Sequence, residues 1–372
     1  MDRPDRIREI TLDRREITLD PPFVANWDPT PRTTFEATLV TVRTEQGITG
    51  YGSGDTMVGF EAYQHLFIDQ PLMAMDRHVR ALETITFHAG RYWPLEAALW
   101  DAIGKSLDVT VAELFGGHTD SLPLYASTGA VADPHERAQM CMGLQEEGFS
   151  AVKLRINERD LAGGLRTIEA VRSAVGEDFE IMVDLNQSWR MPGDTRRGLD
   201  AVDVADFLDR CQDYRLFWVE EPLPLEDATG LSLIRGRGPR LAGGEMVRTW
   251  PELARLAHEG VLDVLQPDVV LAAGMLRMRA LTDLLRPAGR HFTPHTWSNG
   301  IGLLANAHVA AGVGAGPFLE FPYDPPTWTI ERRDFVLAEP VAARNGRLEI
   351  PPRPGLGFTP NPELFPRTLE SS

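Results

Sequence analysis

This sequence has few cysteines, no long apolar run and no excess of basic residues. Its two cysteines, Cys141 and Cys211, lie in neither a CxxC nor a metal-binding spacing and form no disulfide framework. We therefore expect a reduced, cytoplasmic setting. No stretch approaches the roughly 18 apolar residues of a membrane span. The first residues, MDRPDRIREITLD, lack the apolar core of a secretory signal, so we expect no membrane partner.

Acidic residues outnumber basic ones, with 54 Asp and Glu against 37 Lys and Arg and a net charge of −17. The lack of a basic field argues against nucleic acid and anionic membrane as partners. An anionic small molecule is not excluded, because a bound cation reverses the sign of the local field. A hydrophobic content of 43% is that of an ordinary soluble protein, and 372 residues predict one large barrel or two domains.

The first third of the chain changes from a strand pattern to a helical one. Residues 1 to about 60 are predicted to form strands, with a hairpin turn at Gln46-Gly47. Within them, the proline-rich stretch PPFVANWDPTPRTT, residues 21–34, is predicted to be a loop. From about 60 to 115 the pattern is helical, most clearly in PLEAALWDAIGKSLDVTVAELFGG.

Short apolar runs recur after about residue 120, roughly 24 to 37 residues apart, and amphipathic stretches fill most of the gaps. Strands that are apolar throughout and separated by helices indicate a parallel sheet covered on both faces. Eight such units close a barrel, and eight runs are present. They are LPLYAS, AVKLRI, FEIMVDL, LFWVEEP, RLAGGE, VLQPDVV, HFTPHT and PFLEFP.

Polar residues follow these runs directly, at the strand ends where barrel enzymes carry their chemistry. In order they are Lys153, Arg155, Asp184, Asn186, Glu220, Glu221, Glu245, Gln266, Asp268, His295 and Glu320. A single polar residue at a strand end is more often only the point where solvent begins. Acids or bases at the end of nearly every strand in succession instead predict a functional site.

Three acids from consecutive strands can converge on one point: Asp184, Glu245 and one of the adjacent pair Glu220 and Glu221. Carboxylate oxygens with room for water match magnesium, and no cluster of cysteine and histidine favours zinc. A metal ion would also explain why a carboxylate is tolerated at the end of a buried strand. Strand alternation sends only one of the adjacent glutamates inward, and the sequence does not choose which.

The remaining strand-end residues have the chemistry of acid–base catalysis. Lys153 and Arg155 alternate on one strand, so both are expected to face the barrel mouth. Asp268 and His295 follow neighbouring strands, and an aspartate beside an imidazole fixes its tautomer and raises its basicity. A histidine with an ordinary loop role is the alternative for His295.

The motifs that contain these residues resemble those of the enolase superfamily, in the mandelate racemase-like group. The resemblance covers nearly the whole chain and follows the family's order and spacing. The matched motifs are AVKLRI, IMVDLNQSW, WVEEP, GGE, QPD, PHTWSNGIG and FLEFP, with EAALWDAIGK in the first domain. The resemblance implies a modified TIM barrel, (β/α)7β, under an N-terminal α+β capping domain that the C-terminal segment completes. The expected division is 1–120, 121–340 and 341–372.

The resemblance also implies roles for individual residues. It implies one Mg²⁺ held by Asp184, Glu220 and Glu245, with Asn186 near that site. It pairs His295 with Asp268 as an acid–base catalyst. Glu320 would donate a hydrogen bond to the enolate oxygen in protonated form, or would position other groups. The common step of the family is removal of a proton α to a carboxylate. Metal and ammonium charges stabilise the product of that step, and Lys153 is placed to supply the ammonium.

One position departs from the family pattern. Relatives often have a second lysine that acts as a base where this chain has Arg155, and a guanidinium with a pKa above roughly 12 is a poor proton acceptor. A single base, His295, suits elimination better than racemisation, which needs a base on each face of the substrate. Arg155 would then bind substrate, unless its environment is unusual.

The cap loops are expected to set specificity, as in the family. The residues Asn26, Trp27 and Arg32 of the first loop offer hydrogen-bonding and aromatic groups suited to a polyhydroxy acid, although they could equally serve only to close the site. The leading hypothesis is an acid-sugar dehydratase that yields a 2-keto-3-deoxy acid. Its alternatives are a racemase or epimerase, a lactone cycloisomerase, a hydroxyproline-type dehydratase and a non-catalytic sugar-acid binding barrel. Relatives commonly assemble, so we expect a homo-oligomer that acts on a small-molecule carboxylate.

Overall fold

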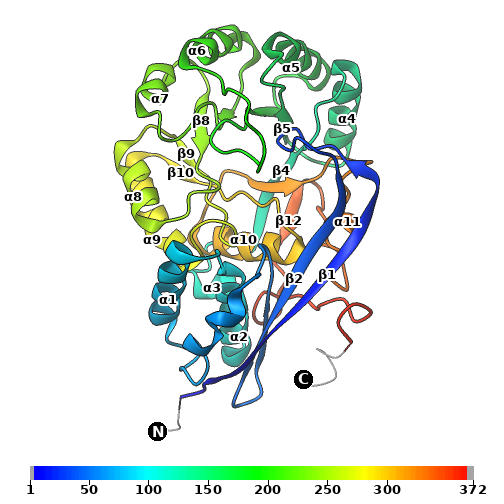
Figure 1. The fold of residues 1–372 in the computed structure, drawn as a ribbon. Helices are drawn as coiled ribbons and strands as arrows, with labels where there is room; N and C mark the ends of the chain where they lie inside the picture. Colours follow the sequence, from blue (N-terminus) through cyan, green and yellow to red (C-terminus); the bar gives the residue numbers. More distant parts are fainter. Residues whose placement is uncertain (1–3, 367–372) are drawn as a thin grey trace.

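An antiparallel sheet begins the chain in this computed structural model, which describes residues 4–366. Strand β1 (Ile7–Phe23) pairs with β2 (Arg32–Thr44), and β2 pairs with β3 (Thr49–Gly52). Figure 1 shows β1 and β2 as a long ribbon running beside the rest of the molecule. The predicted turn at Gln46-Gly47 is confirmed, because Gly47 has a φ of 86° and its N–H bonds to the Thr44 oxygen at 3.2 Å.

The loop predicted over residues 21–34 is shorter than expected. Regular strand continues through Phe23 and begins again at Arg32, so only residues 24–31 are irregular. Phe23 is fully buried, with its ring centroid 4.9 Å from that of Trp328 and 5.8 Å from that of Trp297. The free energy gained by burying this aromatic side chain exceeds the loss of the ladder hydrogen bonds that the neighbouring prolines cannot donate. A sheet edge tolerates that loss.

Helices follow the sheet, as the pattern predicts. They are η1 (Phe60–Ala62), η2 (Gln64–Leu66), α1 (Met75–His88), α2 (Trp93–Leu107) and α3 (Val111–Leu114). Helix α2 packs so closely on the sheet that a Cβ added at Gly50 would lie 2.1 Å from the Ala98 oxygen. Gly50 and Gly52 are therefore required for this contact. No helix within residues 4–366 is long and apolar enough to cross a membrane.

Eight parallel strands and seven helices then alternate between residues 121 and 322, which confirms the predicted (β/α)7β order and the α/β class. The strands are β4 (Ser121–Ser127), β5 (Ala151–Arg155), β6 (Glu180–Asp184), β7 (Trp218–Glu220), β8 (Arg240–Gly243), β9 (Val264–Leu265), β10 (His291–Phe292) and β11 (Leu319–Pro322). The helices are α4 (Pro134–Glu146), α5 (Leu161–Val175), α6 (Ala201–Arg210), α7 (Ala228–Ile234), α8 (Trp250–Glu259), α9 (Leu276–Leu285) and α10 (Gly300–Val313). Short 3₁₀ turns η3 (Gln212–Tyr214) and η4 (Arg286–Ala288) precede β7 and β10.

The sheet curls so that its two ends meet. Its ladder runs β10-β9-β8-β7-β6-β5-β4-β11, and the Gly316 N–H just before β11 bonds to the Phe292 oxygen of β10 at 3.1 Å. Buried apolar residues of six successive strands fill the interior, as in a packed TIM-type barrel. They are Tyr125, Ala151, Met182, Trp218, Ala242 and Val264. The polar residues at the strand ends lie above these apolar side chains.

The C-terminal segment contacts both parts of the molecule. After α11 (Ile330–Arg333), strand β12 (Arg347–Glu349) pairs antiparallel with the start of β4. Further on, the Leu356 N–H bonds to Asp101 Oδ1 of α2 at 2.7 Å, and Phe365 packs in one cluster with residues of β2 and β3. The division into residues 1–120, 121–340 and 341–372 stays a prediction.

His308 of α10 joins these parts, and we expect it to make the fold sensitive to acid. Its Nδ1 accepts the Ala112 N–H of α3 at 3.1 Å, and its Nε2 lies 3.1 Å from the Leu356 oxygen. Burial lowers the pKa of His308 to about 4, although the bond to Leu356 opposes this shift. The neutral ring therefore contributes stability that is present above the unfolded pKa near 6.5 and is lost towards pH 4.

The variant His308→Gln tests this expectation. Its deficit in unfolding free energy relative to the parent should shrink by about 3 kcal/mol between pH 6.5 and pH 4. Urea unfolding of both proteins across this pH range measures the difference, and His135→Gln, at an exposed position on α4, is the control. A deficit that stays constant with pH would contradict the expectation.

Candidate active site

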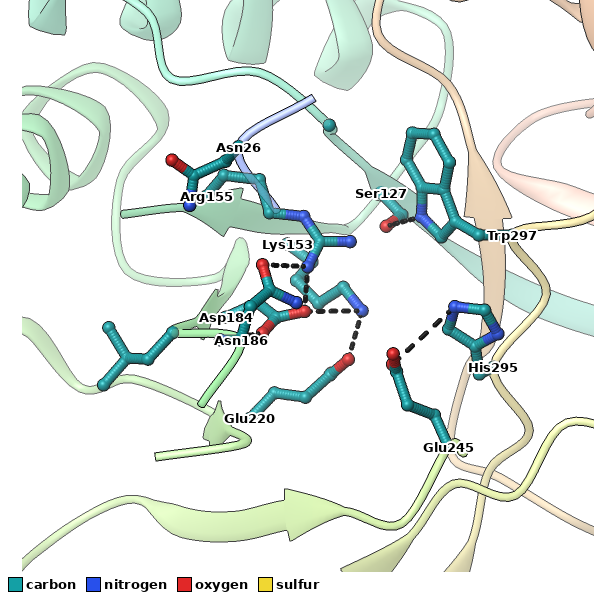
Figure 2. A network of polar contacts seen from close by, with 12 residues as sticks. Asn26, Ser127, Lys153, Arg155, Asp184, Asn186, Glu220, Glu245, His295 and Trp297 are labelled. Atoms are coloured by element: carbon teal, nitrogen blue, oxygen red, sulfur yellow. Dashed lines mark hydrogen bonds and ion pairs between the residues drawn. The ribbon is translucent and has the colours of Figure 1, made fainter. Parts of the chain in front are cut away.

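The register of the barrel strands brings the predicted acids together. Arg155 pairs with Asp184 across β5 and β6, and Asp184 pairs with Glu220 across β6 and β7. Because parallel strands in register end at the same level, these side chains project over the same mouth (Figure 2). Lys153 lies two residues before Arg155 and reaches the same space.

Three carboxylates form a group that can hold a metal ion. One oxygen from each of Asp184, Glu220 and Glu245 lies within 4.8 Å of the others, and all three residues are buried. Of the adjacent pair, Glu220 therefore belongs to this group, as the resemblance implies. The donor set fits a hard cation, because it consists only of carboxylate oxygens and Glu245 Oε2 has no hydrogen-bond partner within residues 4–366.

Lys153 forms the centre of the polar network. Its Nζ contacts Glu220 Oε1 and lies 2.7 Å from Glu320 Oε1 and 3.5 Å from Asp184 Oδ2. Burial alone would lower the pKa of Lys153, but the charges of Glu220 and Glu320 outweigh it and raise the pKa above its ordinary value. Lys153 is therefore an ammonium ion at neutral pH.

Arg155 is fixed beside Asp184 as a cation. Its Nη1 bonds to Asp184 Oδ2 and, at 3.1 Å, to Asn186 Oδ1, while its Nε donates to the Thr128 oxygen at 2.7 Å. The ring centroid of Trp27 lies 4.6 Å from its guanidinium carbon. Burial opposes the charge, but Asp184 and the other carboxylates raise the pKa of Arg155 further. This geometry agrees with a charged, positioning Arg155 rather than a base.

The variant Arg155→Met leaves Asp184 buried without its guanidinium partner. We expect it to lower the unfolding free energy of the metal-free protein by about 3–5 kcal/mol, as for other broken buried pairs. Denaturant unfolding in chelator measures this loss. Arg166→Met, which removes an exposed arginine of α5, is the matched control and should change stability little. A loss below about 1 kcal/mol would contradict the pairing.

His295 and Asp268 form a hydrogen-bonded pair on the other side of the mouth. His295 Nδ1 lies 3.0 Å from Asp268 Oδ2, and its Nε2 lies 3.6 Å from Glu245 Oε2. Asp268 is held in turn by the Val270 N–H and by Asn306 Nδ2. Burial alone would lower the pKa of His295, but the charges of Glu245 and Glu320 and the bond to Asp268 raise it to about 9.

Glu320 is surrounded by donors. Its Oε1 accepts from Ser127 Oγ at 2.7 Å and contacts Lys153, and its Oε2 accepts from the Thr296 N–H at 2.7 Å. Burial alone would raise the pKa of Glu320, but Lys153 and His295 lower it to about 2. Of the two roles that the resemblance implies, this geometry favours an ionised positioning group over a protonated donor.

The first loop contributes unevenly to the site. Asn26 uses its Nδ2 to bond to the Ile156 oxygen at 3.1 Å, and Trp27 packs on Arg155 and, edge to face, on Trp297. Arg32 Nε forms an ion pair with Asp28 Oδ2 at 2.8 Å. The guanidinium carbon of Arg32 lies 5.9 Å from the ring centroid of Trp27. The structure therefore brings Trp27 to the mouth and gives Arg32 a local partner instead.

Sequence reasoning missed several residues of the network, among them two tryptophans and a serine. Trp189 Nε1 donates to Glu245 Oε1 at 2.7 Å, and Trp297 Nε1 donates to Ser127 Oγ at 2.8 Å. Ser127 is the last residue of an apolar run, and the two tryptophans lie inside matched motifs, so position alone could have marked all three. The partners of their side chains depend on how loops fold over the mouth.

A model of the enolase C-terminal domain-like family matches residues 136–364. The chain belongs to this family, which confirms the resemblance to the enolase superfamily.

Named relatives differ in their reactions. The chain is 29% identical over 269 residues to L-talarate/galactarate dehydratase of Salmonella typhimurium, a match that covers 72% of this chain and 62% of that relative's own length. It is 30% identical over 281 residues to D-galactarolactone cycloisomerase of Agrobacterium fabrum, covering 72% of this chain and 70% of the relative. The relatives thus include both sugar-acid dehydratases and cycloisomerases.

A solved structure shares the fold. A mutant L-talarate/galactarate dehydratase liganded with Mg and L-glucarate aligns with a TM-score of 0.82 at 24% identity, covering 97% of this chain and 91% of that chain.

Proposed function

We propose that this protein is a magnesium-dependent sugar-acid dehydratase, which removes the proton α to a carboxylate and eliminates water to give a 2-keto-3-deoxy acid. One observation carries the proposal. The paired imidazole of His295 faces the three-carboxylate group from one side, whereas the other side presents the permanently charged Arg155. The site therefore has one base suited to proton abstraction at carbon, which favours elimination over racemisation.

Asp184, Glu220 and Glu245 would hold the magnesium ion. Their oxygen donors suit it, and the related dehydratase structure that is liganded with Mg supports the choice. When bound, the ion supplies Lewis-acid stabilisation of negative charge on the carboxylate of the substrate. Lys153 adds a fixed ammonium for the same charge.

His295 would move the protons. In its neutral form, Nε2 takes the α-proton of the substrate, while Asp268 holds the proton on Nδ1 and stabilises the imidazolium that forms. The carbon–oxygen bond at the β-position then breaks, and the same proton leaves Nε2 with the departing hydroxyl as water. The remaining enol loses its hydroxyl proton and takes up a proton at carbon, and so becomes the 2-keto acid. Arg155 and Trp27 would position the substrate opposite His295.

A panel of acid sugars with magnesium tests the proposal, with 2-keto acids detected as semicarbazones. We expect a keto acid from at least one member. Exchange of the α-proton in deuterated water without keto acid would favour a racemase or epimerase, and no exchange would favour a non-catalytic binding protein. Either result would overturn dehydration.

Lactone cycloisomerisation is the second candidate, because the relative at 30% identity carries that name. A parallel panel of sugar-acid lactones tests it, because consumption of a lactone without turnover of any acid sugar would favour this reaction over dehydration. Assembly into a homo-oligomer and a cytoplasmic setting stay predictions from the sequence.

A further inference from the structure

Glu221 is a buried carboxylate without a partner. It is 1% exposed, and neither of its carboxylate oxygens has a hydrogen-bond partner within residues 4–366. Burying an unpaired charged group is costly, and such groups normally find a donor, a cation or a metal. The proposed mechanism gives Glu221 no role, so its position requires a separate explanation.

The neighbouring carboxylates are each met by donors or cations. Glu220 meets Lys153 and accepts from Gln266 Nε2 at 2.8 Å, Asp184 meets Arg155, and Glu245 accepts from Trp189. Glu320 has the donors described above. Each of these four acids has at least one donor or cation among the described residues, whereas Glu221 has none.

The backbone holds Glu221 in a conformation that few side chains adopt. Its φ is 45°, in the left-handed region, which residues other than glycine seldom adopt. Its N–H bonds to the Ala242 oxygen and its own oxygen accepts the Gln187 N–H, both at 2.9 Å. Strand β8 on one side and the loop after β6 on the other therefore fix this position, and strained residues held in this way are concentrated at functional sites.

The side chain lies next to the metal group. Glu221 directly follows Glu220 of that group, and its N–H bonds to the Ala242 oxygen of β8, the strand that precedes Glu245. Its Cγ lies beside β8, where a Cβ added at Gly243 would be 3.8 Å away. Glu245 Oε2, which has no hydrogen-bond partner within residues 4–366 either, belongs to the loop that follows β8. The unsatisfied oxygens of Glu221 and Glu245 thus belong to residues that follow two neighbouring strands, β7 and β8.

We propose that Glu221 is an outer-sphere residue of the metal site, whose carboxylate accepts hydrogen bonds from water bound to the ion. The inference rests on the proposed magnesium site. Magnesium sheds its water reluctantly and keeps several water molecules when proteins bind it, so these donors require acceptors. Partners one shell away from a metal typically change its affinity by about 10- to 100-fold. Glu221 is a positioning residue in this role, because it acts through the ion's water.

Magnesium titration of the full-length, metal-free protein by calorimetry tests the inference without any turnover measurement. We expect Glu221→Gln to bind Mg²⁺ about 10- to 100-fold more weakly than the parent. Glu226→Gln is the matched control, since it removes an exposed carboxylate five residues further on and should leave the affinity unchanged.

A thermal scan separates this role from a structural one. In chelator, Glu221→Gln should melt at or above the temperature of the parent, because it removes a buried carboxyl group that has no partner within residues 4–366, and Mg²⁺ should raise its Tm less. A lower Tm in chelator with unchanged Mg²⁺ affinity would overturn the inference. If the glutamine variant does not fold, Glu221→Asp keeps the charge but shortens the side chain, and unchanged affinity in that variant would overturn the inference as well.

The same titration distinguishes the two proposals. A parent protein that binds no Mg²⁺ would refute the metal site and the outer-sphere role together. A parent that binds Mg²⁺ while Glu221→Gln binds it equally well would refute only the role of Glu221.

Discussion

Replacing His295 by asparagine is expected to lower kcat by about 10²- to 10⁴-fold, the usual contribution of a general base. Asparagine retains polarity near Asp268 but cannot take a proton from carbon. His295 is not one of the three grouped acids, although its Nε2 lies 3.6 Å from Glu245 Oε2. Its replacement should therefore change the metal affinity little. The loss should therefore appear in kcat and in exchange of the substrate α-proton with deuterated water.

Two further variants serve as a control and a comparison for His295→Asn. His291→Asn removes an exposed histidine at the start of β10, the strand that precedes His295, and should keep the parent's rate. Asp268→Asn should show a loss smaller than or equal to that of His295→Asn, because Asp268 acts by holding the imidazole. Exchange at the parental rate in His295→Asn would require another base and would refute the assignment.

Replacing Glu245 by glutamine is expected to lower kcat/KM by about 10³-fold or more, because several kcal/mol of charge stabilisation depend on the ion. The amide has the shape of the carboxylate but lacks its charge, so Mg²⁺ affinity should fall as well. Treatment of the parent with chelator should reproduce the loss, and added Mg²⁺ should reverse it.

Calorimetric titration together with steady-state rates measures both effects in Glu245→Gln. Glu259→Gln, at the exposed end of α8, removes the same charge far from the grouped acids and is the control. Full turnover in chelator, or in Glu245→Gln, would refute metal-dependent chemistry at this site.

The barrel was predictable because its strands are buried on both faces and are therefore apolar along their whole length. For the same reason, the change from apolar to charged residues marks where each strand ends, and Asp184, Glu220 and His295 lie at such points. The sequence does not reveal strand length. The run VLQPDVV forms only the two-residue β9, because its proline cannot donate to a ladder.

Details that depend on loop paths were not predictable. Strand alternation alone did not decide which of Glu220 and Glu221 points inward. The positive φ of Glu221 was not predictable either, because the usual sequence signal for such a conformation is a glycine. The bond of Trp189 to Glu245 joins residues 56 positions apart through a loop without regular structure. The proline-rich stretch 21–34 was assigned too long a loop, because the buried partners of Phe23 lie near the other end of the chain.

The antiparallel pairing of β12 with β4 has a consequence for synthesis. The edge of β4 that begins the barrel stays open until residues 347–349 have left the ribosome, and the contact of Leu356 with Asp101 forms later still. Domains that fold as they emerge complete themselves from the N-terminus. This chain cannot, so its nascent form must keep an unpaired strand edge covered, or avoid aggregation through that edge, until residues 347–349 have emerged.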